Sequence, residues 1–263
     1  MILKTIDQKI RKAFSNAAVY YDILTSLHKE IGRDLIKKIL PLASVETILD
    51  VGMGTGWLTQ RLPHYFPGSI VTGVDFAPGM IEAAQRQNEE GFHIVEAHAG
   101  RLPFKKESFD LIISNLAYHW IDDLPQAFQE CRRNLKSDGT LGVTMCGRQT
   151  FDELFTALEN TQTQENNRPM AIRRLPSKEQ ISQALEQTGF ENAEVKEERI
   201  KIRFPDMMAL VQWTKDIGAN ALEKDIYIGR DWLSRANEYY RQHFQDRFGI
   251  YATFEVVWVV AKK

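Results

Sequence analysis

The sequence of 263 residues is short of cysteine, of net charge and of long apolar runs. Its two cysteines, Cys131 and Cys146, could form one disulfide at most. A chain of this size folds without one, because it buries about three quarters of its unfolded surface. We therefore expect two free thiols and a cytoplasmic address. No run approaches the roughly 18 apolar residues of a membrane span, and we expect neither a membrane anchor nor a signal peptide.

The charges are nearly balanced, since 33 Lys and Arg against 35 Asp and Glu give a net charge of −2. This balance excludes a polycationic surface over the whole chain. We expect no nucleic-acid and no membrane partner, although a local basic patch stays possible. Six histidines are scattered without a CxxC or HExxH pattern, so we expect no metal site. With 43% hydrophobic and 26% charged residues, the composition is globular and excludes a disordered chain, collagen or a coiled-coil rod.

Strands and helices alternate along the first half of the chain. The apolar runs are short and closed by turn residues, as in buried parallel strands. Strands are predicted over residues 47–51, 69–75, 92–97, 109–114 and 140–145. Helices are predicted over 58–65, 79–88 and 124–135, with a turn over 136–139. Such alternation indicates a parallel sheet with helices on both faces and ligands at the carboxyl ends of its strands.

The flanking segments are predicted to be mostly helical. Residues 4–40 show helical spacing, with a second such stretch over 27–40 that ends before Pro41. Further helices are predicted over 150–160, 177–188, 206–217 and 229–244, a polar loop over 161–168, and strands over 193–204 and 251–261. Ser177 and Gln180 match a helix capping box. No linker or repeat divides the chain, so we expect a single domain over residues 1–263.

A glycine-rich loop follows the first predicted strand. Asp50 ends that strand, and Gly52, Gly54 and Gly56 follow. Glycine permits positive φ angles and lets a ligand approach the backbone, although a tight strand-to-helix turn would also explain the pattern. The spacing is GxGxG, not the GxGxxG of dinucleotide-binding loops. Asp75 ends the second strand, where a helix N-cap is the alternative interpretation.

Residues 45–146 resemble the class I S-adenosylmethionine (SAM)-dependent methyltransferases. The resemblance rests on DxGxGxG at 50–56, Asp75, LPF at 102–104 and FDLIISNLA at 109–117. It implies an α/β fold with a doubly wound, mainly parallel, seven-stranded Rossmann-like methyltransferase sheet. Residues 1–40 would form an N-terminal helical lid, 45–146 the SAM-binding core, and 147–263 the substrate-side elements with a late helical insertion. The implied cofactor is SAM, the methyl donor, without a metal.

The resemblance also implies roles for individual residues. Asp50 and the glycine loop would hold the methionine part of SAM. Asp75 would accept both ribose hydroxyls, each bond worth roughly 1.5–3 kcal/mol. The other implied cofactor-binding residues are Phe76, His98, Ala99 and Asn115. His98 stands where the family often has an Asp for the adenine amino group; a neutral imidazole can accept from that group, and an exposed loop histidine is the alternative.

Nearly end to end, the chain is similar to the malonyl-acyl-carrier-protein O-methyltransferases of biotin synthesis. The similarity rests on FxxAAxxYD at 14–22, NLAYHWIDDL at 115–124, QTFDEL at 149–154 and KxIGAN at 215–220. KxIGAN discriminates most, because many enzymes share the SAM core. His119 is a departure, since the family often has Gln before the Trp. The implied reaction is methyl esterification of the free carboxylate of a malonyl thioester, on the carrier protein or on coenzyme A.

The implied reaction needs little acid-base chemistry. A carboxylate is already ionised at pH 7, so no general base is required. Tyr21 and His119 are the candidate catalytic residues, for which core packing and loop capping are the alternatives. Arg148 and Lys215 are candidate substrate-binding residues; a guanidinium suits a carboxylate, and a plain surface arginine is the alternative for Arg148.

The implied partner is an acidic acyl carrier protein. Its docking requires a basic rim, and paired basic residues occur at 11–12, 132–133 and 173–174. We favour Arg173 and Arg174, which adjoin the polar loop. Two rivals stay open, namely another small-molecule carboxyl- or C-methyltransferase and a non-catalytic SAM-binding partner subunit. A nucleic-acid methyltransferase is disfavoured, because residues 115–118 lack both prolines of an NPPY motif.

Overall fold

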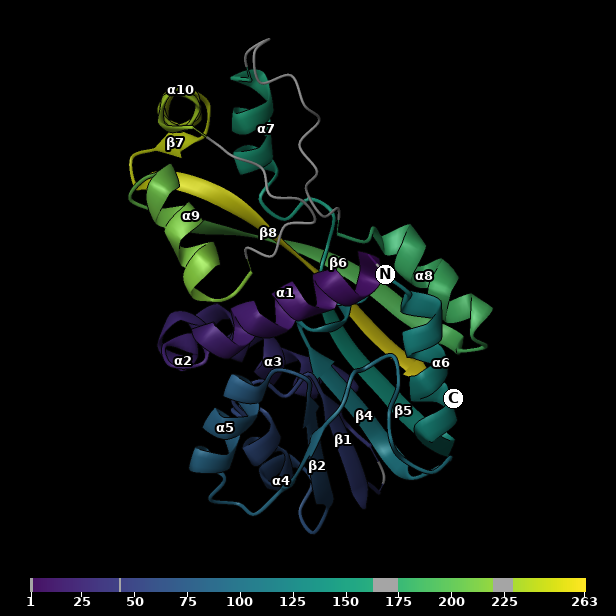
Figure 1. Ribbon diagram of the computed structural model, residues 1–263. Helices are drawn as coiled ribbons and strands as arrows, with labels where there is room; N and C mark the ends of the chain where they lie inside the picture. The colour runs from purple at the N-terminus through teal and green to yellow at the C-terminus, as the bar shows by residue number, and fades with distance from the viewer. Residues whose placement is uncertain (1, 43, 163–174, 220–228) are drawn as a thin grey trace.

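One sheet forms the centre of the computed structural model, which describes residues 2–42, 44–162, 175–219 and 229–263 (Figure 1). Its strand order is β3-β2-β1-β4-β5-β8-β6, and β7 pairs with β8. The strands are β1 (Thr47–Val51), β2 (Ile70–Asp75), β3 (His93–Glu96), β4 (Phe109–Asn115), β5 (Leu135–Cys146), β6 (Glu191–Phe204), β7 (Gln245–Asp246) and β8 (Gly249–Lys262). β1 to β5 are parallel, while β8 is antiparallel to β5 and β6. The expected seven-stranded path is confirmed, and the two-residue β7 was not predicted.

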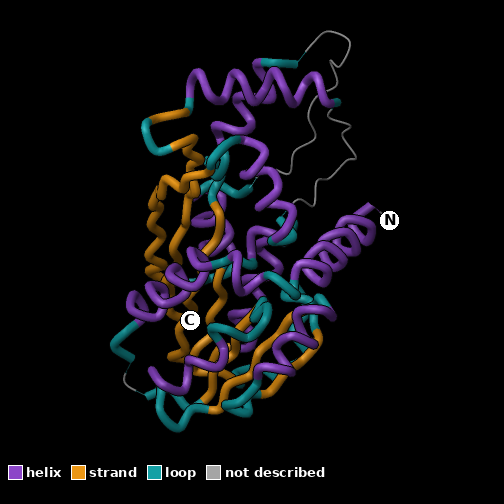
Figure 2. The backbone as a smooth tube through the Cα atoms, turned by 90° about the vertical axis from the view of Figure 1, so that its left-hand side faces the viewer, coloured by secondary structure: helices purple, strands orange, loops and turns teal. Residues whose placement is uncertain are grey.

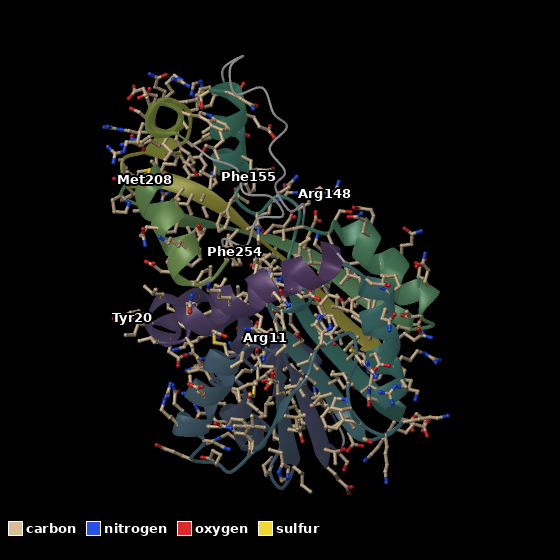
Figure 3. All side chains as sticks on the ribbon, in the orientation of Figure 1. Arg11, Tyr20, Arg148, Phe155, Met208 and Phe254 are labelled. Carbon is tan, nitrogen blue, oxygen red and sulfur yellow. The ribbon has the colours of Figure 1, made fainter. Side chains whose placement is uncertain are left out.

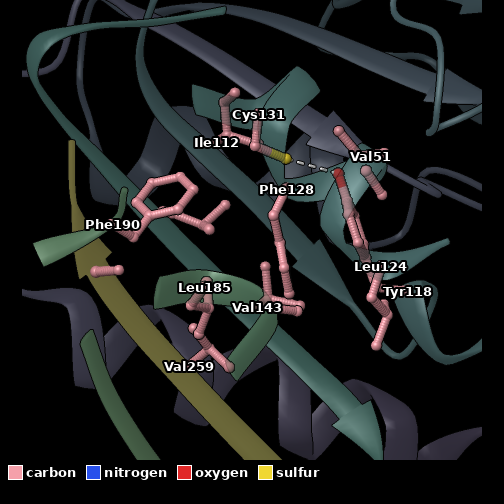
Figure 4. Packing of buried hydrophobic residues seen from close by; sticks show 14 of the residues in the cluster. Val51, Ile112, Tyr118, Leu124, Phe128, Cys131, Val143, Leu185, Phe190 and Val259 are labelled. Carbon is pink, nitrogen blue, oxygen red and sulfur yellow. Dashed lines mark hydrogen bonds between the residues drawn. The ribbon is translucent and has the colours of Figure 1, made fainter. Parts of the chain in front are cut away.

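Helices cover both faces of the sheet, as a doubly wound fold requires. On one face, α6 (Leu124–Asn134) and α8 (Lys178–Gln187) pack around Phe128 and Leu185 (Figure 4). The other core joins α3 (Ser26–Ile39), α4 (Leu62–Tyr65), which follows the 3-10 turn η1 (Thr59–Arg61), and α5 (Pro78–Gln87). Leu49 of β1 belongs to the first core and Ile48 to the second. Both faces of β1 are therefore buried, which explains why its apolar residues are consecutive.

β5 begins at Leu135, so the predicted boundary at residue 140 and the turn before it were wrong. Phe109 pairs with Leu135 but Leu111 pairs with Thr140, so the extra residues of β5 bulge out of the ladder. Lys136, in the bulge, forms an ion pair of 2.9 Å with Asp110 on β4. The polar residues 136–139, which the sequence analysis assigns to a turn, are therefore part of β5.

The helices differ in detail from the predicted segments. The helical segment predicted over 4–40 is α1 (Ile2–Ala17), which begins two residues earlier, then α2 (Tyr21–Leu24) and α3, which matches the second predicted stretch and ends before Pro41. The helix predicted over 58–65 is η1 followed by α4, because Pro63 lacks an N–H and sits in the first turn of a new helix. The capping box of α8 is confirmed. Residues 163–168 of the predicted polar loop lie outside the described residues.

A helical layer lies at one end of the sheet. β6 and β8 are each 14 residues long and extend beyond the parallel strands. α7 (Asp152–Asn160), α9 (Met207–Asp216) and α10 (Arg230–His243) pack on this extension around Leu210, Trp232 and Tyr240 (Figures 1 and 2). They form the late helical insertion that the sequence predicts. None of the described helices is both long and apolar enough to span a membrane.

Candidate cofactor and substrate site

Two cavities meet at the glycine loop, beneath α1 and α2. Cavity A has a volume of about 60 Å³ and is lined by Tyr21, Asp22, Thr25, His28, Lys29, Asp50, Gly52, Met53, Gly54, Thr55, Trp57, Leu58 and Asn115. Cavity B has a volume of about 80 Å³ and is lined by Asp7, Phe14, Tyr21, Val51, Gly52, Gly54, Asp75, Phe76, Met80, His98, Ala99, Asn115, Leu116, Ala117, Trp120 and Ile121. Because Tyr21, Gly52, Gly54 and Asn115 line both, the two cavities form one site.

The glycine loop combines a tight turn with an open face. Gly52, Gly54 and Gly56 have φ angles of +74°, +59° and +80°, which side-chain-bearing residues rarely adopt. A Cβ on Gly52 would lie 2.3 Å from the Cβ of Ala117, so the end of β4 packs directly on the loop. A Cβ on Gly54 would meet nothing within 4 Å. Gly52 therefore serves packing, whereas Gly54 exposes its backbone to the cavities.

Asp75 is a buried carboxylate at the end of β2. Its two oxygens accept from Gly54 N (2.9 Å) and Ala77 N (2.8 Å). The N-cap of α5 is Ala77, without a side-chain capping bond, so the alternative that Asp75 is the helix N-cap was wrong. Burial raises its pKa, and the backbone N–H donors oppose the rise. A carboxylate has about four acceptor sites, so Asp75 retains acceptor capacity toward cavity B.

Asp50 lies at the floor of cavity A. Its side chain is buried, and Thr59 Oγ1 donates a hydrogen bond of 2.7 Å to it. Burial raises its pKa to about 7, while the hydrogen bond from Thr59 opposes the shift. Asp50 therefore changes protonation near neutral pH, unlike an exposed carboxylate.

Tyr21 lines both cavities and comes from α2. Its ring makes edge contacts with Phe14 and His28 at centroid distances of 6.5 and 6.1 Å. Burial, followed by the charge of Asp75, raises the pKa of its hydroxyl, which remains a neutral phenol at physiological pH. Among the described residues, its hydroxyl has no hydrogen-bond partner. Tyr21 is thus a protonated donor placed between the two cavities.

His28 is a cavity residue that the sequence analysis missed. Its Nδ1 is buried without a hydrogen-bond partner in the described structure. Burial lowers its pKa to about 4, so the ring is neutral at pH 7. Trp213 and Phe254 contact it at 6.2 and 5.9 Å. The sequence carries no signal for it, because those partners are distant along the chain.

Asn115 is held by the protein at both ends of its amide. It donates to His28 O (2.9 Å) and accepts from Thr144 Oγ1 (2.8 Å). Thr144 Oγ1 also accepts from Leu116 N, and Leu116 has a φ of 54°. A positive φ costs a non-glycine residue conformational free energy, so these hydrogen bonds hold the strained end of β4 in place. Asn115 lines both cavities as a positioned wall.

Phe76, His98 and Ala99, three of the candidate cofactor-binding residues, all line cavity B. The rings of Phe76 and His98 meet at 5.7 Å and 90°. His98 Nδ1 accepts from Gly100 N at 3.1 Å, so a neutral ring carries its proton on Nε2. His98 therefore presents a donor, not the acceptor expected for an adenine amino group.

The FxxAAxxYD motif places α1 and α2 on the site. Ala17 and Ala18 pack against α5, and Gly79 of α5 is so close that a Cβ there would lie 2.3 Å from Ser15 O. Arg11 donates to Phe76 O at 2.7 Å and forms an ion pair with Glu96 (Figure 3). α1 is therefore anchored to the ends of β2 and β3.

The KxIGAN segment packs against the same N-terminal helices. Gly218 has a φ of +80°, and a Cβ added at this position would lie only 3.2 Å from Ala13 O. Trp213 Nε1 donates to Leu24 O at 3.0 Å. Lys215 is exposed in the last turn of α9 and lines neither cavity A nor B, and Asn220 lies outside the described residues. The motif thus joins the late insertion to α1 and α2.

His119 lines a third cavity, cavity C, together with Ile121, Asp122, Leu124, Pro125, Pro176, Gln180, Gln183, Ala184 and Gln187. Cavity C has a volume of about 330 Å³. His119 is buried and its Nδ1 accepts from Cys146 N at 3.3 Å. Arg148 donates to Gln180 Oε1 at 2.8 Å (Figure 3). The structure thus separates His119 and Arg148 from Tyr21, while Arg173 and Arg174 lie outside the described residues.

Comparisons with known proteins identify the family of the chain. A family model described as a methyltransferase domain matches residues 49–143. A malonyl-acyl-carrier-protein O-methyltransferase from Hahella chejuensis is 32% identical over 94% of this chain and 88% of that protein. One from Bacillus anthracis is 30% identical over 98% of this chain and 97% of that protein.

The chain belongs to the malonyl-acyl-carrier-protein O-methyltransferase family.

Solved structures share the fold of this methyltransferase. Protein YcgJ of Bacillus subtilis has a TM-score of 0.64 and 20% identity, over 89% of this chain and 98% of that one. Phosphoethanolamine N-methyltransferase 2 of Haemonchus contortus, in complex with S-adenosyl-L-methionine, has a TM-score of 0.55 and 20% identity, over 88% and 52%. These structures show the Rossmann-like fold, and membership of the family makes the enzyme a SAM-dependent methyltransferase.

The site of the enzyme fits SAM. The open backbone at Gly54 and the buried carboxylates of Asp50 and Asp75 suit a cationic, hydroxyl-bearing ligand. The aromatic wall at Phe76 suits a purine ring. Among the described residues, no group of three or more His, Cys, Asp or Glu side chains is placed to hold a metal ion.

Proposed function

We propose that this enzyme methylates the free carboxylate of a malonyl thioester on an acyl carrier protein, giving the methyl ester at an early step of biotin synthesis. The similarity over nearly the whole chain to proteins of that name carries the proposal. The similarity extends beyond residues 49–143, which the family model matches, so it includes the N-terminal helices α1 and α2 and the helix α8 that lines cavity C.

The proposed chemistry needs positioning more than proton transfer. SAM, when bound, supplies a methyl group on a cationic sulfur, and the C–S electron pair stays on sulfur as the carboxylate oxygen bonds to the methyl carbon. No proton moves, because the carboxylate is ionised at pH 7. The protein has to hold the acceptor in line and exclude water, and orientation of this kind can supply roughly 7–11 kcal/mol.

Tyr21 is the proposed donor to the acceptor carboxylate. Burial keeps its hydroxyl protonated, and it lies between cavities A and B. A neutral donor orients an anion without neutralising it, so the carboxylate keeps its nucleophilicity. A strong cationic clamp would stabilise the ground state and slow the attack.

The cofactor residues have separate proposed tasks. Asp75 would accept the ribose hydroxyls, Phe76, His98 and Ala99 would enclose the adenine, and Asp50 with Gly54 would border the methionine part. Asn115 acts on the site by fixing the end of β4. α1 and α2 form the proposed lid, because they contribute Phe14 and Tyr21 to the cavities.

The carrier protein is proposed to dock on the side of cavity C. His119 lines this cavity, and Arg148 reaches its wall through Gln180. Arg173 and Arg174 lie outside the described residues and stay candidate docking residues on the sequence alone, as a basic pair just before Leu175 and Pro176. Lys215, exposed in the last turn of α9, stays a candidate substrate-binding residue. We also propose a cytoplasmic address, which two buried, unpaired cysteines support.

A methyl-transfer assay tests the function. The enzyme is incubated with methyl-labelled SAM and malonyl-carrier protein, and the product is analysed for a base-labile methyl ester. Malonyl-coenzyme A, free malonate and aromatic acceptors serve as comparison substrates, which separate the proposed activity from other carboxyl- and C-methyltransferases. If a folded, SAM-binding enzyme produced no ester from the malonyl thioesters, the proposed function would be wrong.

A further inference from the structure

Cavity C is the largest of the three cavities and is distinct from the cofactor site. Its volume is about 330 Å³, against about 80 Å³ for cavity B. Ile121 lines both B and C, so this residue forms part of the wall between them. The Trp120 ring, which lines B, contacts the His119 ring, which lines C, at 5.2 Å. A ligand in cavity C therefore lies one side chain away from the cofactor site.

The walls of cavity C differ in chemistry. Gln180, Gln183 and Gln187 lie on one face of α8, because residues three and four apart are neighbours on a helix. Ile121 and Leu124 provide an apolar wall. Within the described part of the chain, the side chains of Gln183 and Gln187 have no hydrogen-bond partner. The cavity thus offers unpaired amides beside apolar surface.

Gln180 is already fixed in place. Its Oε1 accepts from Ser177 N at 3.0 Å in the capping box and from Arg148 at 2.8 Å. Both bonds use the oxygen, so the NH₂ group of Gln180 stays available to an acceptor. Arg148 brings a cationic guanidinium to this end of α8, next to the cavity.

We propose that cavity C binds the phosphopantetheine arm of the thioester substrate, an assignment that rests on the proposed function. The arm carries two amides separated by methylene groups and ends in a branched, hydroxylated unit. Amide side chains can pair with its amides, while the apolar wall accepts its methylenes. The thioester end would then lie beside Ile121, which lines both cavity C and cavity B, where Tyr21 lies.

A cavity-filling substitution tests the assignment. Gln183 is exposed and lines cavity C, so Gln183→Trp should fill the cavity without disturbing the core. Glu186→Trp is the control, because Glu186 is exposed on the same helix but does not line the cavity. Each variant is assayed with malonyl-carrier protein and with the truncated thioester malonyl-N-acetylcysteamine. We expect the ratio of the two kcat/KM values to fall about tenfold or more in Gln183→Trp. In Glu186→Trp the ratio keeps its wild-type value.

A second variant removes the amides without adding bulk. In Gln183→Leu with Gln187→Leu, the same ratio is expected to fall about threefold, since paired amides are lost. An unchanged ratio in Gln183→Trp, or an equal fall in Glu186→Trp, overturns the assignment. If wild-type enzyme binds SAM in calorimetry but esterifies neither thioester, the proposed function fails, and the arm assignment fails with it.

Discussion

At the residue scale, the site contains several ionisable side chains whose pKa values are shifted by burial. Asp50 and Asp75 have raised pKa values, and that of His28 is lowered, in each case because burial disfavours the charged form. The phenol of Tyr21 is held neutral for the same reason. Such groups give strong directional contacts in a dry cavity but cost folding stability.

The carboxyl of Asp50 should make stability depend on pH. Its pKa is about 7 in the folded state against 3.8 ordinarily, so between pH 4 and 7 the folded protein holds a proton that the unfolded chain has lost. This contribution is complete below pH 3.8 and is lost as the pH rises to about 7.

Denaturant unfolding at pH 5 and pH 8 checks the Asp50 prediction. Wild type should lose free energy of unfolding between pH 5 and pH 8, whereas Asp50→Asn, which has no carboxyl to titrate, should not. The difference between the two proteins should therefore change by on the order of 1–4 kcal/mol in favour of the variant. Asp34→Asn is the control, because its side chain is half exposed. A difference between wild type and Asp50→Asn that is the same at both pH values would contradict the assigned pKa.

Tyr21→Phe should reduce turnover. Removing one hydrogen bond to a charged acceptor costs roughly 1.5–3 kcal/mol, or about 10- to 100-fold in kcat/KM. Calorimetric titration with SAM, run beside the methyl-transfer assay, separates this loss from loss of cofactor. An unaltered kcat/KM would assign Tyr21 to packing alone.

Arg148→Ala should raise KM for the malonyl thioester. The guanidinium fixes Gln180 and carries positive charge beside cavity C, so its loss weakens binding by about three- to tenfold. Arg203→Ala, which removes an exposed arginine paired with Asp246 elsewhere on the sheet, is the control. Equal kinetics in wild type and Arg148→Ala would remove Arg148 from the substrate site.

At the element scale, α1 is held over the site by close helix packing. Small residues allow this approach, because Gly79 of α5 has no Cβ and Ala17 and Ala18 face it. Arg11 adds polar bonds to the ends of β2 and β3. The amphipathic pattern predicts a helix here, but it does not state which surface the helix covers.

Gly79→Ala should displace α1 and weaken SAM binding. The added Cβ would lie 2.3 Å from Ser15 O, a backbone atom that can move only with the helix. We expect the Kd for SAM to rise about tenfold, while the sheet stays folded by circular dichroism. Glu82→Ala, at an exposed position on α5, is the matched control. If Gly79→Ala bound SAM with wild-type affinity, α1 would not close the site.

At the scale of the whole molecule, the sheet carries two specialised ends. The parallel strands end at the cofactor cavities, while the extended β6 and β8 carry the late helices back to α1 and α2. Cavity C lies between α6 and α8, and Arg148 is hydrogen-bonded to Gln180 in its wall. The proposed carrier protein would therefore meet a surface built from residues 119–125, Arg148 and α8.

Docking of an acidic carrier should depend on salt. KM for malonyl-carrier protein should rise severalfold between low and high ionic strength, because exposed charges are screened beyond about 10 Å at 0.1 M salt. Arg173→Glu with Arg174→Glu should raise KM at low salt and flatten the salt dependence. A KM that stays constant with ionic strength would exclude this docking mode.

The sequence by itself determined the sheet, the glycine loop and the family, because these depend on local patterns: apolar runs, alternate glycines and acids at strand ends. Tertiary structure decided the rest. Trp213 meets Leu24 across 189 positions, and Arg11 meets Glu96 across 85, so no local pattern could pair them. It also placed His119 in cavity C and Tyr21 between A and B. Which cavity a side chain enters depends on how separate elements pack, and that packing minimises free energy over the whole chain.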